Sequence, residues 1–385
     1  MQHMTKFMYA PQPAIQVASR KDSAAAAELE WPIELLRIIA ALLVVVAHYL
    51  PQATQNLGVA RFAYTGVDLF FVITGYVFAR NLTGGVGNLW AYSLRRFFRI
   101  YPLYVVALLA YVSVRLVNGG QIEHLGLHLL FLHTLESREI AFFYNPTFWS
   151  LPPELEFYFA LPLLALMVRH SGSVWWLVAA AAALHLWISS LITPGSMAVT
   201  TPFLLSVHLP GLLLEFLLGA VAWRMTRKLT GNWQAWVLMV LGVGVWLLLA
   251  TWLPVSTPSP AMTPAWLQWA RLFPNLLAAL CFACVMVASV RLLGPLAGWP
   301  ARWGLWWGSL TYGVYLFHNA ALQLLEPLRP ALSNWGLITV CLIATVVTSL
   351  VLHHAVEIPA RALGRKLSQR VTGLPFGAAQ LSRTA

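Results

Sequence analysis

An arginine and a histidine stand eleven residues apart in an otherwise aliphatic stretch, residues 33–51 (IELLRIIAALLVVVAHYLP). Ionisable groups at membrane depth are costly, so they usually face a protein interior or water and mark function. In a helix, the steps from Arg37 to His48 return to within about 20° of the same face, roughly 16 Å further along. Glu34 lies one turn before Arg37 and can pair with it. The stretch therefore predicts one helix face with a cation near one membrane surface and a proton-accepting imidazole near the other.

Composition indicates what kind of chain carries this helix. The sequence has 385 residues, is 59% hydrophobic and 10% charged, and has a mean hydropathy of +0.71. A soluble globular domain has about 25% charged residues, so we expect an all-α polytopic membrane protein. The net charge of +11 would suit nucleic acid, but the basic residues form short clusters between apolar runs. That pattern is an orientation signal in a membrane, and we expect no nucleic-acid partner.

Three cysteines, Cys281, Cys284 and Cys341, lie inside apolar runs. Cys281 and Cys284 form a CxxC pair, but the sequence offers no further ligands with zinc-site spacing. Free cysteine behaves as a small hydrophobic residue, so we interpret all three as packing residues and expect no metal cofactor.

Ten apolar stretches are each near the roughly 20 residues needed to cross a bilayer. A further stretch, residues 122–135, is short and amphipathic and is predicted to lie at the interface. Residues 1–30 lack the apolar core of a cleavable signal peptide, so the first span itself would be the targeting signal. The ten predicted spans are 33–50, 64–80, 100–117, 148–168, 174–192, 203–223, 233–253, 271–291, 305–325 and 335–356.

The basic residues predict the orientation of these spans. With a cytoplasmic N-terminus, 18 of the 24 Lys and Arg residues fall inside, five fall outside, and Arg37 lies within the first span. Cytoplasmic loops carry the excess of basic residues, so both termini are predicted to be cytoplasmic, with Arg37 toward the cytoplasm and His48 toward the outside. The predicted parts are a cytoplasmic arm (1–30), a membrane domain (31–361) and a cytoplasmic basic tail (362–385).

Two more stretches place ionisable residues near this first helix. Residues 66–76 (GVDLFFVITGY) put Asp68 at the outer end of the second span, where it either caps the helix or orients and charges His48. Residues 93–102 (SLRRFFRIYP) put Arg96 and Arg99 one turn apart on the cytoplasmic side. Two such guanidiniums can hold a diphosphate in fork geometry, although a positive-inside cluster has the same sequence pattern.

The fourth and ninth spans carry the remaining candidates. Residues 147–162 (TFWSLPPELEFYFALP) contain Glu154, predicted to face a cavity, and Glu156, which points to another face and suits an interfacial charge. Residues 309–319 (SLTYGVYLFHN) place Tyr312, Tyr315 and His318 on one broad helix face, as a substrate site or as a core stripe. Three further ionisable residues lie in spans five and six: His185 and His208, interpreted as structural, and Glu215, a lesser candidate for the same cavity.

Together these stretches resemble the acyltransferase-3 family of integral-membrane O-acyltransferases. The shared patterns are an Arg and a His with ten residues between them on the first helix, GVDLFF, RRxxRIxP, WSLxxExxFY, a SYxxYLxH-like stretch and a terminal Glu-x-Pro at Glu357 and Pro359. Thr74 and Thr311 stand where serine is usual in the family. The resemblance extends from Ile33 to about Arg361, and the esterase-like domain that many members append is not expected here.

The resemblance implies a multi-pass enzyme of the bacterial inner membrane. It would move an acyl group, most simply acetyl from acetyl-CoA, to a hydroxyl of an extracytoplasmic glycan or lipid-linked sugar such as an exopolysaccharide, with membrane lipid around it. Whether His48 is the general base or carries the acyl group stays open, as do a succinyl or longer chain and the oligomeric state. The implied residues are His48, Asp68 and Glu154 for catalysis, Arg37, Arg96 and Arg99 for acyl-CoA, and Tyr312, Tyr315 and His318 for the acceptor.

A transporter or flippase of a lipid-linked glycan is the alternative from another functional class. Its intramembrane Arg, His and Glu residues would be substrate or proton sites without bond chemistry. Transporters of this kind often contain internal repeats, and none is visible in the sequence, so the combination of motifs favours the enzyme.

Overall fold

A computed structural model describes residues 20–54, 58–171, 173–192, 200–253, 273–294 and 299–372, and the regular elements in these ranges are all helical. The prediction of an all-α protein is confirmed. Residues 1–19 of the predicted arm and 373–385 of the predicted tail lie outside the described part. The main helices are α1 (Arg20–Tyr49), α2 (Gly58–Phe62), α3 (Gly66–Val77), α4 (Ala79–Gly84), α5 (Leu89–Val117), α6 (Leu125–Leu129), α7 (Arg138–Ala141), α8 (Leu151–Ser171), α9 (Val174–Ser190), α10 (Thr201–Val207), α11 (Leu209–Lys228), α12 (Asn232–Trp252), α14 (Pro274–Leu293), α15 (Trp299–Leu325), α16 (Asn334–Leu352) and α17 (Ile358–Thr372).

Seven of the predicted spans correspond to helical stretches long and apolar enough to cross a membrane within the described residues. The other three are also helical but differ in kind. α3 has 12 residues and continues through Phe78 into the six residues of α4, because the N–H of Phe78 donates to the carbonyl of Thr74 and that of Leu82 donates to the carbonyl of Phe78. α9 has 17 residues and α15 has 27 residues with a more polar sequence. The multi-pass architecture is therefore confirmed.

α1 and α15 run parallel and keep one register along their length. At one end Gly304 packs under Trp31, because a Cβ on this glycine would lie 3.0 Å from the indole. At the other end the Tyr49 hydroxyl donates a 2.6 Å hydrogen bond to the carbonyl of His318. This register holds against each other the two helix ends that the charge pattern predicts to face outward, the outer ends.

The short helix α3 crosses α11 at backbone distance. A Cβ on Gly75 would lie 1.6 Å from the carbonyl oxygen of Phe216, and one on Gly219 would lie 2.0 Å from that of Val72. Small residues allow such close helix approach within a membrane protein. Gly75, which follows the GVDLFF stretch, is therefore explained by this crossing.

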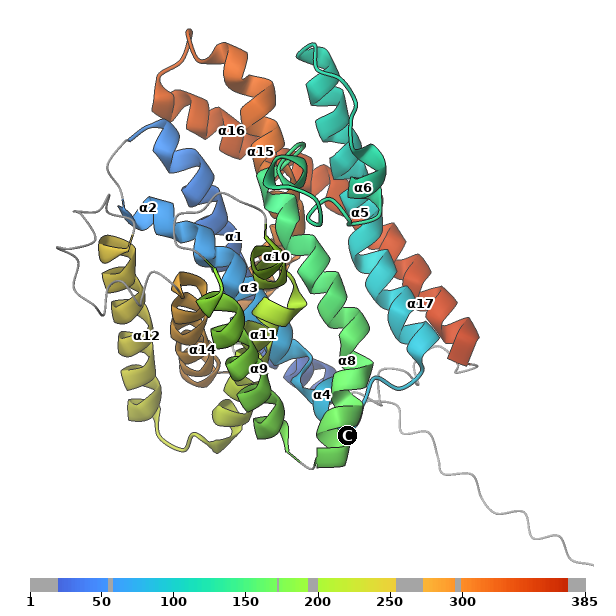
Figure 1. Cartoon of the computed structure of the whole chain (residues 1–385), viewed down its shortest axis with the longest axis vertical. Coiled ribbons are helices and arrows are strands. Elements are labelled where there is room, and N and C mark those ends of the chain that lie inside the picture. The colour runs from blue at the N-terminus through green and yellow to red at the C-terminus, as the bar shows by residue number, and fades with distance from the viewer. Residues whose placement is uncertain are drawn as a thin grey trace, which may run out of the picture.

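α5 and α17 lie side by side at the right of Figure 1, while α12 and α14 form the opposite edge. Gly364 of α17 faces Phe98 of α5, and a Cβ added at this glycine would lie 2.6 Å from the Phe98 Cβ. A π-helical turn, His353–Glu357, joins α16 to α17 and bends the chain toward α5. On the opposite edge, Trp236 is 59% exposed, as a lipid-facing residue of α12 would be.

The predicted interfacial segment, residues 122–135, folds against α5 through short turns and α6 rather than forming one amphipathic helix. Phe131 stacks on Tyr104 with 4.4 Å between ring centroids, and the Tyr104 hydroxyl donates to the carbonyl of His128. His128 and His133 are both buried and stack with centroids 4.2 Å apart. The segment is therefore an integral part of the outer end of the bundle.

Candidate functional site

The structure brings His48 and His318 together at the outer ends of α1 and α15. Their ring centroids are 5.0 Å apart in an edge arrangement. His318 Nε2 lies 3.4 Å from His48 Nδ1. His318 is buried and His48 is half-buried, so the pair has one inner and one accessible member.

The hydrogen bonds assign a tautomer to each ring. His318 Nδ1–H donates to the carbonyls of Val314 and Tyr315, at 3.1 and 2.9 Å, which leaves Nε2 as an acceptor toward His48. His48 Nδ1–H donates to the carbonyl of Val44 at 2.9 Å and points to His318 Nε2. The free lone pair of His48 is therefore on Nε2, where a base needs it.

A neighbouring tyrosine fixes this arrangement. Tyr49 is 2% exposed, and its hydroxyl lies between the carbonyl of His318 and the hydroxyl of Thr345, which is 3.1 Å away. This joins α1, α15 and α16 behind the histidine pair. Nearby, the amide of Asn319 donates to Asn145 at 2.9 Å and links α15 to the segment before α8.

The opposite end of the same helices is densely charged. Glu34 and Arg37 form the predicted ion pair, and Glu357 pairs with Arg361 in α17. Arg361 lies within electrostatic range of Arg99 and Arg37. The Glu-x-Pro stretch thus brings α17 to the inner ends of α1 and α5.

His353 and Ser309 extend this charged group between α15 and α16. His353 Nδ1 lies 2.7 Å from a Glu357 carboxylate oxygen, and its Nε2 lies 3.3 Å from the Ser309 hydroxyl. A buried carboxylate is therefore held from two sides, by an arginine and by an imidazole.

Arg96 and Glu154 meet through Tyr158 of α8. The Arg96 guanidinium lies 5.8 Å from the Tyr158 ring centroid and 5.1 Å from that of Phe78. The Tyr158 hydroxyl donates to Glu154 at 2.5 Å. Arg99 also lies within electrostatic range of Tyr158, so Glu154 belongs with the arginines of α5. Among the described residues, the hydrogen bonds of His48 are made with Val44 and His318, not with Glu154.

Asp68 is placed away from the histidine pair. It is fully buried in the first turn of α3, and its Oδ1 accepts a 3.1 Å hydrogen bond from Asn275 of α14. The buried Glu215, on α11, lies within electrostatic range of it. The expected contact between Asp68 and His48 is not formed; the hydrogen bond of Asp68 instead ties α3 to α14.

The two tyrosines predicted to bind the acceptor donate hydrogen bonds to backbone carbonyl oxygens. The Tyr312 hydroxyl donates to the carbonyl of Ile100 at 3.0 Å, and the Tyr315 hydroxyl donates to that of Thr147 at 2.8 Å. Tyr315 also lies 2.6 Å from the Ser150 hydroxyl. These contacts pack α15 against α5 and the start of α8, the arrangement expected of the core stripe.

Two other interpretations can be compared with the structure. Glu156, expected as an interfacial charge, lies 2.5 Å from His208 Nδ1 and accepts the backbone N–H of Leu209 at 2.8 Å. It therefore anchors the N-terminus of α11. The Nδ1–H of His185 donates to the carbonyl of Gly211 at 2.7 Å, a contact that fits the structural interpretation.

Sequence reasoning did not identify the supporting residues Tyr49, Asn145 and Asn319. Tyr49 and Asn319 directly follow the two histidines, so a polar neighbour next to each histidine in an apolar run was the available signal. Asn145 precedes the fourth span and had no periodic pattern to mark it.

Comparison with known proteins places this arrangement in a family. The family profile described as an acyltransferase domain (Acyl_transf_3) matches residues 31–354. The chain is similar to "Putative peptidoglycan O-acetyltransferase YrhL" of Bacillus subtilis (strain 168), with 24% identity over 371 residues, 87% of this chain and 56% of that protein. It is also similar to "Acyltransferase MdmB" of Streptomyces mycarofaciens, with 31% identity over 229 residues, 52% of this chain and 57% of that protein.

The chain spans little more than half the length of these two relatives. No solved structure gives a significant match. The family match covers the helix with Arg37 and His48, the arginines of α5, the α8 stretch and His318. By this match over most of its length, the chain belongs to the acyltransferase-3 family.

Proposed function

We propose that this chain is a membrane O-acyltransferase that takes an acyl group from acyl-CoA on the cytoplasmic side and gives it to an acceptor hydroxyl on the outer side. The observation that carries the proposal is the placement of the His48–His318 pair and the arginine group at opposite ends of the same helices. A base and an anion site about 16 Å apart along α1 suit a donor whose thioester and diphosphate are separated by the pantetheine chain. The family membership supports the same conclusion.

In this proposal the inner arginines bind the donor. Arg96 and Arg99 hold the diphosphate of CoA, because guanidinium forks match phosphate oxygens. Arg37 is held by Glu34 and lies nearer the thioester side of the chain. Glu154 orients Tyr158 beneath Arg96 and keeps that cation in place.

At the outer end, His48 acts on the acceptor hydroxyl. His48 Nε2 takes the proton as the hydroxyl oxygen bonds to the thioester carbonyl carbon, the C–S bond breaks, and the CoA sulfur leaves as a thiolate that is then protonated. His318 accepts a hydrogen bond from His48 Nδ1–H and keeps Nε2 unprotonated before the reaction, a positioning role like that of the third member of a triad. If His48 carries the acyl group covalently, the same Nε2 bonds to the carbonyl first.

The proposed donor is acetyl-CoA, and the proposed acceptor is an extracytoplasmic glycan or lipid-linked sugar in a bacterial inner membrane. Glycan mass spectrometry of a host with and without the gene tests this. Loss of acetyl groups from an otherwise complete glycan supports the enzyme, and restoration by the wild type but not by His48→Gln assigns it to this site. Loss of the whole glycan would support the transporter, and loss of a larger acyl group would correct the donor.

A further inference from the structure

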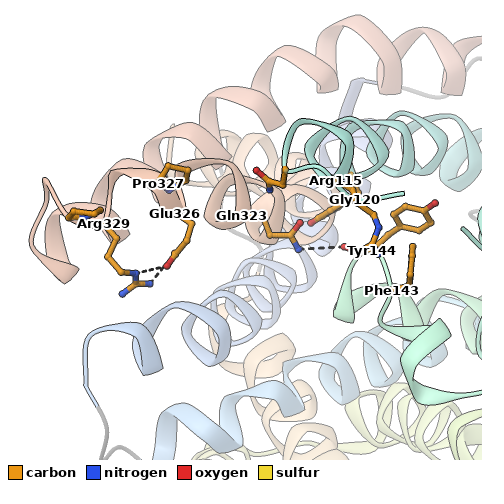
Figure 2. A pocket seen from close by; sticks show the side chains of 11 residues that line it. Arg115, Gly120, Phe143, Tyr144, Gln323, Glu326, Pro327 and Arg329 are labelled. Atoms are coloured by element: carbon orange, nitrogen blue, oxygen red, sulfur yellow. Dashed lines mark hydrogen bonds and ion pairs between the residues drawn. The ribbon is translucent and has the colours of Figure 1, made fainter. Parts of the chain in front are cut away.

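A cavity of 1010 Å³ lies at the end of the bundle where α5 and α15 finish, at the outer end in the predicted orientation. Figure 2 shows Arg115, Phe143 and Tyr144 at one side, Glu326 and Arg329 at the other, and Gln323 between them. Ligand pockets usually measure about 300–1,000 Å³. This volume suits a saccharide of more than one ring.

Two short stretches of chain connect the cavity to the histidine pair. Gln323, which lines the cavity, follows His318 by five residues on α15, a rise of about 7.5 Å. On the rim, the Arg329 side chain donates to Gln52 at 2.9 Å. Gln52 follows His48 by four residues, about 6 Å along a helical path. The cavity therefore lies at the same end of the bundle as the histidine pair, which does not itself line it.

The two arginines of the cavity have different states. Arg329 is saturated, because its guanidinium holds both carboxylate oxygens of Glu326, at 2.6 and 3.1 Å, and also reaches Asn334 and Gln52. The Arg329–Glu326 ion pair has no net charge and forms part of the rim. In the described part of the chain Arg115 has no carboxylate within ion-pair distance, so it supplies the uncompensated positive charge of the cavity.

The Arg115 side chain is also fixed in place. Its guanidinium lies 3.7 Å from the centroid of the Phe143 ring, and its Nε donates to the carbonyl of Gln121 at 2.9 Å. Gly120 makes room for it, since a Cβ there would be 2.7 Å from Arg115 Cγ. An arginine held flat by a ring and one hydrogen bond keeps its terminal nitrogens for a planar oxyanion at little further entropic cost.

We propose that this cavity is the acceptor site and that Arg115 selects an anionic saccharide, one with a carboxylate or phosphate near the hydroxyl to be acylated. The inference rests on the proposed acyl transfer. The aromatic wall of Phe143 and Tyr144 suits the apolar faces of sugar rings, and the Gln323 amide suits their hydroxyl edges. Arg115 then adds specificity, because a charge-assisted, two-point hydrogen bond is available only to an acidic sugar.

Direct binding tests the site without requiring turnover. The full chain in lipid nanodiscs is titrated by calorimetry with trigalacturonate, with maltotriose carrying a phosphate ester, and with unmodified maltotriose. We expect the wild type to bind at least one anionic trisaccharide about tenfold more tightly than maltotriose, because a hydrogen bond to a charged group is stronger than one between neutral groups. The anion that binds distinguishes a carboxylate from a phosphate acceptor.

Variants assign the preference to Arg115. Arg115→Gln should remove the preference for the anion and leave maltotriose binding within about twofold, and Arg115→Lys should retain part of it because charge remains without the planar fork. Arg138→Gln is the matched control: its arginine also stacks on phenylalanines of this end of the bundle but does not line the cavity. It should bind as the wild type does.

The outcomes separate this inference from the proposed function. Two results would overturn the inference alone, provided that acyl transfer from acetyl-CoA to the trisaccharides is still observed. One is equal binding of neutral and anionic trisaccharides by the wild type, and the other is an anion preference that persists in Arg115→Gln. An anion preference lost in Arg115→Gln together with such transfer would support both. Absence of acyl transfer to every acceptor would overturn the proposed function and with it the role of the cavity as an acceptor site.

Discussion

At the scale of single residues, the base has a histidine partner where a carboxylate was expected. His318 Nε2 faces His48 Nδ1, while Asp68 and Glu154 contact other groups. A neutral imidazole acceptor holds the tautomer of His48 without adding a buried negative charge, which would be costly at this depth. In the proposed mechanism the roles therefore divide into a reacting His48, a positioning His318 and a donor-side Glu154.

His48→Gln keeps a hydrogen-bonding side chain but removes the usable base. We expect acyl transfer to fall by at least about 10²-fold, as for other positioned bases, with normal membrane levels because His48 is half-buried. Transfer is measured from labelled acetyl-CoA in proteoliposomes. Near-normal transfer by properly inserted His48→Gln would make His48 a structural residue.

His318→Gln tests positioning. The His318 side chain does not reach the acceptor in the proposed geometry, so in the variant kcat should fall while KM for the acyl-CoA stays near the wild-type value. His318→Asn serves as a second, smaller variant in case glutamine does not fit the buried site. An effect confined to KM would contradict the positioning role.

Arg96→Lys with Arg99→Lys keeps two charges and removes both planar forks. If these residues hold a diphosphate, acyl-CoA affinity should drop while the amount of inserted protein stays constant. Binding is measured with a non-hydrolysable acyl-CoA analogue. Arg169→Lys, at the end of α8 and outside this group, is the control. Unchanged affinity in the double variant would assign the arginines to membrane orientation only.

At the scale of elements, two contacts between chain-distant segments position the site. The parallel pair α1 and α15 brings the histidines together, and the glycine crossing of α3 and α11 sets the position of α3 in the bundle. Both depend on close approach of backbones, which side-chain volume at single positions can prevent.

Gly219→Val should therefore lower the stability of the protein. The Cβ of the valine would lie 2.0 Å from the carbonyl oxygen of Val72, so α3 and α11 must separate. Overpacking of this kind costs about 1–3 kcal/mol and occasionally more. Gly244→Val on α12 is the control, because its Cβ has nothing within 4 Å. Thermal unfolding in detergent compares the two; equal unfolding temperatures would contradict the crossing.

The segment between α5 and α7 gives the protein a predicted pH dependence. Burial, together with the neighbouring His133, lowers the pKa of His128 to about 3, and burial lowers the pKa of His133 to about 4. In the unfolded chain the pKa of both histidines is near 6.5, so the stability gained by burying them as neutral rings is fully present above that pH. It is lost as the pH falls toward 4, at about 1.4 kcal/mol per histidine per pH unit.

Unfolding temperatures measured between pH 7.5 and 4.5 check this sign. The double variant His128→Gln, His133→Gln should show a smaller decrease on acidification than the wild type does, whatever its stability at neutral pH. An identical decrease in both proteins would mean that other groups set the acid sensitivity.

At the scale of the whole molecule, the proposed function requires that the two ends of the bundle face different compartments. The excess of basic residues in the predicted cytoplasmic loops gives the expected orientation. A reporter fused after Arg370 should therefore be cytoplasmic, with inactive alkaline phosphatase and a fluorescent green fluorescent protein. The matched fusion after Asn118, at the end of α5, should have active phosphatase. The reverse pattern would place His48 on the cytoplasmic side and overturn the proposed direction of transfer.

The sequence by itself determined the class of protein and the chemistry available to it. A chain with 10% charged residues must bury its backbone polar groups in helices when it enters a bilayer, so the all-α, multi-pass architecture follows from composition and periodicity. Spacing along a single helix also predicted the Glu34–Arg37 pair and the shared face of Arg37 and His48, because local geometry is regular.

Only the tertiary structure decided which of these residues meet. His318 lies 270 residues from His48, and Arg361 lies far along the chain from Arg99, so helix periodicity has no information on either contact. The expected Asp68–His48 contact is not formed, because α3 places Asp68 beside Asn275 and within electrostatic range of Glu215. The cavity at Arg115 likewise requires segments from both halves of the chain to pack together. Long-range packing, which follows from side-chain volume and backbone approach across the whole bundle, determines the site.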